Sequence, residues 1–135
     1  MKKTLVVLLV LIVLGSVSGY CIINSVFPKA SPISYPLTEE ITSISLYENN
    51  NNSVTINKEA LEPILQEFLN VKPTRKMSVN DYPTVGNYYM LEIEASQRFY
   101  RYFIYQEGTQ MYIELPYEGI YKINNQLYDS LKLYF

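Results

Sequence analysis

The sequence predicts an α+β domain in which an antiparallel sheet of about five to six strands packs on one amphipathic helix and a short C-terminal helix, preceded by an N-terminal apolar helix. Three observations lead to this prediction. Residues 4–27 carry no charged side chain. Between residues 41 and 123, several segments alternate apolar and polar residues, as half-buried strands do. Two further segments, near residues 57–69 and 124–131, place apolar residues at helical spacing.

Residues 1–27 are predicted to be a membrane anchor or a signal segment. Lys2 and Lys3 precede an uncharged run longer than the roughly 20 residues that a helix needs to cross a bilayer. Ser16 and Ser18 are spaced as in a signal cleavage site, so removal of the segment is the alternative. In both cases the bulk of the chain is expected outside the cell, as a single-pass membrane protein or as a secreted one.

Cys21 raises a third interpretation, because bacterial lipoproteins carry their lipid on a Cys just after an apolar segment. Those signals place a small residue before the Cys, whereas Tyr20 occupies that position here. Cys21 is therefore interpreted as an apolar residue of the anchor. A single Cys also excludes an internal disulfide framework.

The remainder of the chain is long enough for one small domain. Pro28, Pro32 and Pro36 recur every four residues, which predicts an extended stalk over residues 28–40 and a single α+β domain over residues 41–135. The chain has 11 basic and 13 acidic residues, and two of the basic ones lie in the N-terminal segment. This acidic balance argues against nucleic acid as a partner.

The first half of the domain is predicted to form two strands and a helix. Residues 41–47 alternate as a strand does, an Asn-rich turn follows, and residues 54–56 return as a second strand. Asn57 is a suitable N-cap for a helix that carries one apolar stripe. Pro63 restricts residues 58–62 to a first turn or a short 3₁₀ segment. The stripe comprises Leu61, Ile64, Leu65, Phe68 and Leu69.

Residues 72–87 contain two prolines and little periodicity, which predicts a long irregular loop. Lys72, Arg75 and Lys76 lie near its start. They are interpreted either as a solvated stretch of the loop or as a patch that binds a partner.

The next three segments predict one another's register. A short turn at Ser96 and Gln97 joins residues 88–95 to the following strand and sets Glu92 opposite Arg101. A two-residue turn at Glu107 and Gly108 then pairs the second of these strands with the third. The predicted pairs are Ile104 with Met111, Tyr102 with Ile113, Arg101 with Glu114, and Phe103 with Tyr112.

These registers predict a sheet with one buried and one exposed face. The exposed face is expected to carry a cross-strand ladder of Glu92, Arg101 and Glu114. Met90, Phe103 and Tyr112 are expected to border this ladder. After it, residues 120–123 form a short strand, and Asn124 or Asn125 caps a last helix with Leu127 and Leu131 on one side.

Three strings carry a resemblance to a known family: residues 72–76 (KPTRK), residues 78–81 (SVND) with Pro83, and residues 116–121 (PYEGIY). From residue 41 to the C-terminus the chain resembles a family of small extracytoplasmic domains of unknown function from Firmicutes. The resemblance implies a secreted, lipid-anchored or membrane-tethered protein. The family has no assigned activity, so the resemblance implies no functional residue.

The residue inventory is poor in catalytic groups. The chain has no His and one Cys, and no Gly-rich phosphate loop. No catalytic residue, cofactor or metal site is predicted. We expect a non-enzymatic binding or sensing module tethered at the cell surface, with another membrane or cell-wall component as partner. The alternative is a cell-envelope hydrolase that uses carboxylates alone. The candidate binding residues are Glu92, Arg101, Phe103, Tyr112 and Glu114 on the sheet and Arg75 and Lys76 in the loop.

Overall fold

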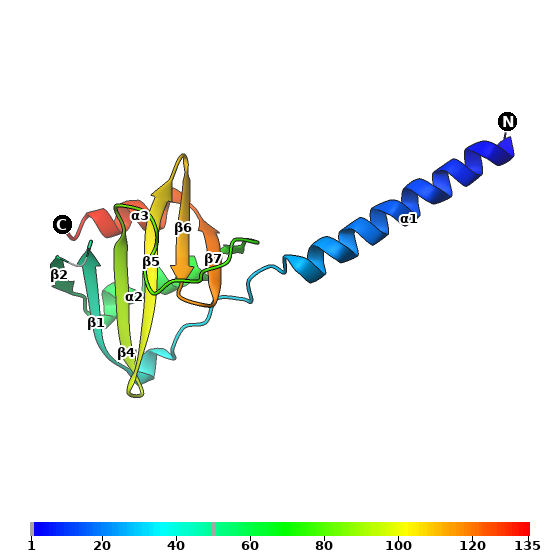
Figure 1. Ribbon diagram of the computed structural model, residues 1–135. Coiled ribbons are helices and arrows are strands. Elements are labelled where there is room, and N and C mark those ends of the chain that lie inside the picture. The colour runs from blue at the N-terminus through cyan, green and yellow to red at the C-terminus, as the bar shows by residue number, and fades with distance from the viewer. Residues whose placement is uncertain (1, 50) are drawn as a thin grey trace.

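A computed structural model describes residues 2–49 and 51–135 of the chain. Its first element, α1 (Lys2–Val26), is a long apolar helix that extends away from the folded domain (Figure 1). Among the described residues it is the one helix whose length and composition suit a membrane span, with a mean hydropathy of 2.7. A signal sequence meets the same criteria, so α1 is compatible with either role.

The domain is built on a seven-stranded sheet in which every neighbouring pair is antiparallel. The strand order is β2-β1-β4-β5-β6-β7-β3. The predicted α+β class is confirmed, and a two-residue strand, β3, adds to the predicted count. The strands are β1 (Ile41–Glu48), β2 (Asn52–Thr55), β3 (Lys72–Pro73), β4 (Tyr89–Ala95), β5 (Arg98–Glu107), β6 (Gln110–Leu115) and β7 (Gly119–Ile123).

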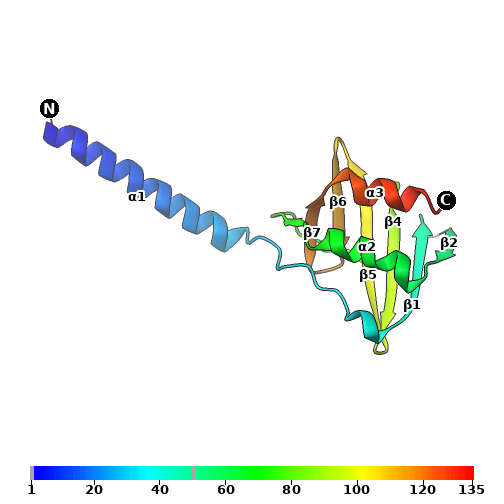
Figure 2. The same ribbon diagram turned by 180° about the vertical axis from the view of Figure 1, so that it is seen from behind.

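Two helices, α2 (Lys58–Phe68) and α3 (Asn125–Lys132), cover one face of the sheet (Figure 2). Each begins at a predicted cap: the Asn57 side chain accepts a hydrogen bond from the Ala60 N–H at 2.8 Å, and the Asn124 side chain accepts one from the Leu127 N–H at 3.3 Å. A short 3₁₀ helix, η1 (Thr38–Glu40), precedes β1. The core lies between these helices and the sheet and includes Leu61, Phe68, Leu91, Tyr102, Ile113 and Leu127.

Helix α2 runs through Pro63, whereas a shorter lead-in was predicted. The N–H that proline lacks would have bonded the carbonyl of Glu59, four residues earlier. Pro63 and Glu59 are both exposed, so water can satisfy that carbonyl. The apolar stripe of α2 is buried as predicted except for Leu69, which is exposed.

The segment between β3 and β4 crosses the sheet face opposite the helices (Figure 1). Residues 72–87 were predicted to be a long irregular loop, and apart from β3 they form no helix or strand. Two rings of the segment between β3 and β4 nevertheless pack on the sheet. Tyr82 and Tyr88 contact Phe103 with ring centroids 5.6 Å and 5.4 Å apart. Their packing buries Phe103 completely. The second face of the sheet is therefore partly covered, which differs from the predicted exposed face.

The register between β4 and β5 is confirmed. Ala95 pairs with Arg98, and Glu92 pairs with Arg101. The two turn residues, Ser96 and Gln97, have φ of 49° and 63°. Positive φ at both positions is what a tight type I′ hairpin requires.

The predicted register between β5 and β6 is wrong by two residues. Glu107 pairs with Gln110, so Gly108 and Thr109 form the turn. Gly108, with φ of 62°, takes the first turn position, where the left-handed conformation favours glycine. Consequently Glu114 pairs with Phe103 and not with Arg101, and Tyr112 pairs with Tyr105 and not with Phe103.

Residues 28–36, expected to belong to a free stalk, lie against the domain. The Ala30 N–H donates to the Thr74 carbonyl at 3.0 Å. The hydroxyls of two buried tyrosines donate to this segment, Tyr121 to the Ser31 carbonyl at 2.7 Å and Tyr102 to the Ser34 carbonyl at 2.8 Å. The segment thus satisfies buried polar groups of the core, which a free stalk does not do.

Candidate functional site

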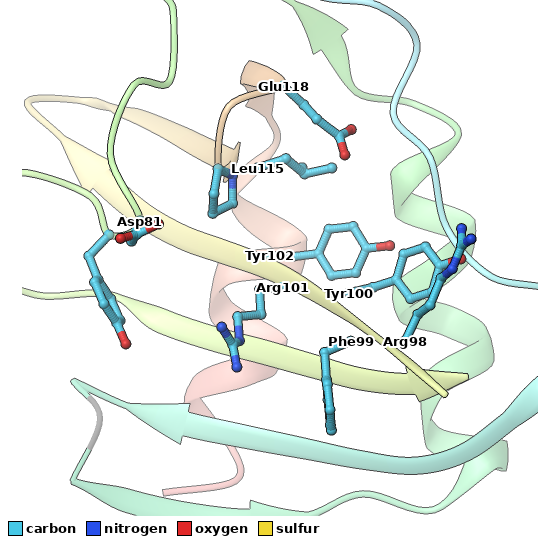
Figure 3. A pocket seen from close by; sticks show the side chains of 10 residues that line it. Asp81, Arg98, Phe99, Tyr100, Arg101, Tyr102, Leu115 and Glu118 are labelled. Carbon is cyan, nitrogen blue, oxygen red and sulfur yellow. The ribbon is translucent and has the colours of Figure 1, made fainter. Parts of the chain in front are cut away.

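A surface depression, called the groove below, lies beside the first half of β5 and has a volume of about 550 Å³. Three parts of the chain line it: the segment before β4, strand β5 itself, and the turn between β6 and β7. Figure 3 shows Asp81 at one end, Arg98 and Phe99 at the other, and Arg101 between them. The lining residues are Asp81, Tyr82, Arg98, Phe99, Tyr100, Arg101, Tyr102, Leu115, Pro116 and Glu118.

The groove exists because β5 is longer than β6. The pairing of β5 with β6 covers Phe103 to Glu107, and continuing this register would set Pro116 opposite Arg101. Proline has no N–H to donate to a ladder. The chain turns away there, and Tyr117 adopts a φ of 62°. The first residues of β5 are therefore paired with β4 on one side and with no strand on the other.

Two residues of β5 direct backbone groups into the groove. In an antiparallel hairpin with a two-residue turn, the closing pair is hydrogen-bonded, and hydrogen-bonded pairs then alternate along the strands. Arg98, Tyr100 and Tyr102 accordingly bond β4. The N–H and C=O groups of Phe99 and Arg101 point away from β4, and within residues 2–49 and 51–135 none of these groups has a hydrogen-bond partner. We call them the open edge.

Arg101 is held in place by an ion pair across the hairpin. Its Nε donates to Glu92 Oε2 at 2.7 Å, as the predicted register required. This hydrogen bond, reinforced by the negative charge of Glu92, raises the pKa of the Arg101 guanidinium. Half of the Arg101 side chain is exposed, so the pair itself contributes about 0 to 1 kcal/mol to stability. Its clearer role is to orient Arg101 in the wall of the groove.

Glu114, predicted to complete the ladder with Arg101, lies elsewhere. Its side chain is buried, with 6% of its surface exposed, in the layer beneath the crossing segment. Ser78 donates to Glu114 Oε1 at 2.7 Å, and the Tyr105 hydroxyl donates to Oε2 at 3.0 Å. Burial, together with the negative charge of Glu114, raises the pKa of Tyr105. Glu114 therefore fastens the crossing segment to the sheet and does not face the groove.

Two other predicted residues are also placed away from the groove. Phe103 is buried under Tyr82 and Tyr88 and cannot contact a partner. Tyr112 is half-buried, and the Lys76 ammonium lies 4.5 Å from the centre of its ring. Of the five sheet residues predicted as a binding face, only Arg101 lines the groove, with Glu92 as its ion-pair partner.

Arg75 and Lys76 have partners of their own. Lys76 forms an ion pair with Glu107, and the hydrogen bond within this pair raises the pKa of the lysine. Arg75 donates to Asn24 Oδ1 at 2.5 Å and also to the Phe27 carbonyl, both at the C-terminal end of α1. A cation at that end of a helix is favoured by the helix dipole. The two residues do not line the groove.

The groove carries charges of both signs. The Tyr117 hydroxyl donates to Asp81 at 3.0 Å, and this contact raises the pKa of Tyr117. Ser34 donates to Glu118 at 3.3 Å. The structure, as far as it describes the chain, contains no cluster of three or more His, Cys, Asp or Glu side chains that could hold a metal ion. The arrangement suits binding through hydrogen bonds and aromatic contacts.

The sequence did not predict most of the groove: of its ten lining residues, Arg101 alone was a candidate binding residue. One signal could have revealed it. Pro116 ends β6 at a fixed distance from the hairpin turn, whereas β5 extends three residues beyond the position opposite that proline. With the correct turn, this mismatch in strand length predicts an unpaired stretch of β5.

Comparison with known proteins finds a family and a solved structure whose descriptions name no activity. Residues 29–122 match the family described as "Domain of unknown function (DUF5300)". The fold is similar to the NMR structure of a protein from Ruminococcus gnavus, with a TM-score of 0.62 and 33% sequence identity over 73% of this chain and 98% of that one. A search of curated proteins finds no match.

Proposed function

The chain belongs to the family described as a domain of unknown function (DUF5300), and from that premise we propose that it is a non-enzymatic binding module tethered at the outer face of the cell membrane. The groove is its binding site, and another membrane or cell-wall component is its partner. The observation that carries this proposal is the groove itself. A volume of about 550 Å³ bordered by exposed aromatic and charged side chains is the form of a recognition site.

The tether is proposed from α1. Its apolar side chains are exposed along the helix, and such a surface needs a bilayer or another apolar environment to cover it. Lys2 and Lys3 precede the apolar run, which favours a cytoplasmic N-terminus and a domain outside. Arg75, which donates to Asn24 and Phe27, would keep the domain close to the membrane surface.

This topology predicts a specific behaviour in cells. The full-length protein should remain in the membrane pellet after washing with alkaline carbonate, and protease added outside intact protoplasts should remove the domain. Both are detected by immunoblot with tags at either end of the chain. A soluble form that begins near Gly19 or Tyr20 would show that the segment is cleaved and the tether is absent.

The binding role is supported by the exposed ring of Phe99, 60% of which is accessible at one end of the groove. Aromatic rings and arginines contribute most to recognition when a partner covers them. The groove offers both, because Arg98 and Arg101 line it together with Phe99. A site of this composition requires no nucleophile, metal or cofactor.

The alternative function, a hydrolase that uses carboxylates, has less support. The two carboxylates of the predicted ladder do not share a cleft: Glu92 is paired with Arg101, and Glu114 is buried against Ser78 and Tyr105. Two carboxylates must flank one substrate bond to act as an acid and a base. We therefore expect the intact protein to show no turnover of peptide or glycoside substrates.

Site-specific photo-crosslinking tests the proposed binding site. A photoreactive phenylalanine at position 99, in the full-length protein in its own membranes, should give a discrete crosslinked product. The matched control is the same residue at position 133, because Leu133 is 87% exposed and lies outside the groove. Equal product patterns from positions 99 and 133, or no product from position 99, would overturn the proposed site.

A further inference from the structure

The groove contains an unpaired length of strand as well as side chains, and this feature specifies the kind of partner. We infer that the groove binds an extended peptide segment of another protein, which adds to β5 as a further strand. The inference rests on the proposed binding function and names the chemical class of its partner. It is carried by the open edge, the N–H and C=O groups of Phe99 and Arg101.

An extended peptide is the direct complement of the open edge. Phe99 and Arg101 each present one donor and one acceptor on the same side of β5. A strand repeats its edge groups every second residue, or about 6.6 Å, so a peptide two to four residues long matches all of them at once. Sheets commonly bind peptides in this way, with the main chain providing affinity and alternate side chains providing specificity.

The walls of the groove suit the side chains of such a peptide. Alternate residues of an added strand would point to opposite faces of the sheet. On one face they would meet Phe99 and Tyr82, and on the other Tyr100. The exposed Phe99 ring favours an apolar side chain. Arg98 and Asp81 at opposite ends of the groove give it charges of both signs, which favours a peptide without a strong net charge (Figure 3).

The outer strands of the sheet provide an internal comparison. Strand β3 is two residues long and includes Pro73, which has no N–H to offer. Strand β2 presents small polar residues, Asn52, Ser53 and Thr55, on an exposed edge. Neither strand lines the groove. A peptide that binds by the inferred mode should therefore select β5 over β2.

The test uses isotope-labelled full-length protein in detergent micelles and a defined probe, a capped peptide of four Val-Thr repeats with one Lys at each end. On binding, amide exchange should slow at Phe99 and Arg101 and remain unchanged at Ser53 and Thr55 of β2. A matched peptide with N-methyl groups on alternate residues of one edge lacks the donors for pairing, so it should bind at least about tenfold more weakly.

A pair of variants at one position separates the backbone from the ring. Phe99→Ala and Phe99→Pro both remove the ring, but only proline also removes the N–H that faces the groove. Because that N–H does not bond β4, proline at this position interrupts no ladder bond. We expect Phe99→Pro to bind the probe at least about tenfold more weakly than Phe99→Ala. If Phe99→Pro does not fold, the N-methylated peptide makes the same comparison on the native protein.

Three results would overturn the inference: equal binding of the two peptides, protection at β2 in place of β5, or protection of Phe99 and Arg101 by dimerisation without peptide. These outcomes differ from a failure of the proposed function. A discrete crosslinked product from position 99 combined with no edge protection would leave a binding site that recognises its partner through side chains. Absence of both would remove the site altogether.

Discussion

Phe103→Ala is expected to lower the free energy of unfolding by about 3 to 5 kcal/mol, as the loss of a fully buried aromatic ring does. Phe103 has 0% exposure although it lies on the sheet face opposite the helices. Tyr82 and Tyr88 cover it, and both belong to the segment that crosses this face. The cost therefore measures how firmly the crossing segment is packed. Urea denaturation of the full-length protein in detergent gives the value.

Phe99→Ala is the matched control for this prediction. Phe99 is the same residue type on the same strand and the same face, four positions earlier, but it is 60% exposed. Its removal should change stability by no more than about 0.5 kcal/mol. Similar small costs for the two variants would show that the segment does not cover Phe103 and that the originally predicted exposed face is present in solution.

Gly119→Ala is expected to cost about 1 to 3 kcal/mol, because an added methyl group overfills a packed site. A Cβ on Gly119 would lie 2.4 Å from the Cβ of Ala30, far inside normal contact. The φ of Gly119, 158°, adds backbone strain for any other residue. Relief requires residues 28–36 to move away, which breaks the bonds from Ala30 to Thr74 and from Tyr121 to Ser31.

Two further variants make this prediction specific. Gly86→Ala places a Cβ where no atom lies within 4 Å, so it should be nearly neutral. Ala30→Gly combined with Gly119→Ala removes the colliding atom and should recover part of the lost stability, which is a positive coupling between the two sites. Additive costs in the double variant would mean that residues 28–36 do not pack against β7.

The contrast between the two hairpins shows what the sequence can determine. In the first hairpin, alternation excluded a slip of one residue, and the short turn at Ser96 and Gln97, which sets Glu92 opposite Arg101, identified the pairing of β4 with β5. A slip of two residues keeps every side chain on its face, so alternation could not exclude the wrong pairing of β5 with β6. Turn chemistry decided that register, through Gly108 at the first position of the turn.

The crossing segment was unpredictable for a different reason. Its contacts are few and long-range: Ser78 donates to Glu114, and Tyr82 and Tyr88 pack on Phe103. No local periodicity encodes such contacts, because each depends on where the sheet has already placed its partner. The burial of Glu114 was unpredictable for the same reason. A buried carboxylate needs hydrogen-bond donors, and Ser78, which provides one of them, lies far from Glu114 in the sequence.

The candidate site was predicted in part. Arg101 and Glu92 were identified from the register of one hairpin, and both are where that register places them. The rest of the groove depends on the end of β6 at Pro116 and on the turn that follows. Asp81, at one end of the groove, lies in a segment with no periodic pattern, and Arg98, at the other end, is the first residue of β5. Sequence patterns carry little information at such positions.

Amide hydrogen exchange of the free protein tests the open edge of β5 most directly. The amides of Tyr100 and Tyr102, which bond β4, and that of Phe103, which bonds β6, should exchange slowly. Those of Phe99 and Arg101 should exchange faster by a factor on the order of a hundred or more, because no carbonyl protects them. This alternation within one strand is the predicted result. Uniform slow exchange from residue 99 to residue 103 would contradict it, because another strand would then already occupy the groove.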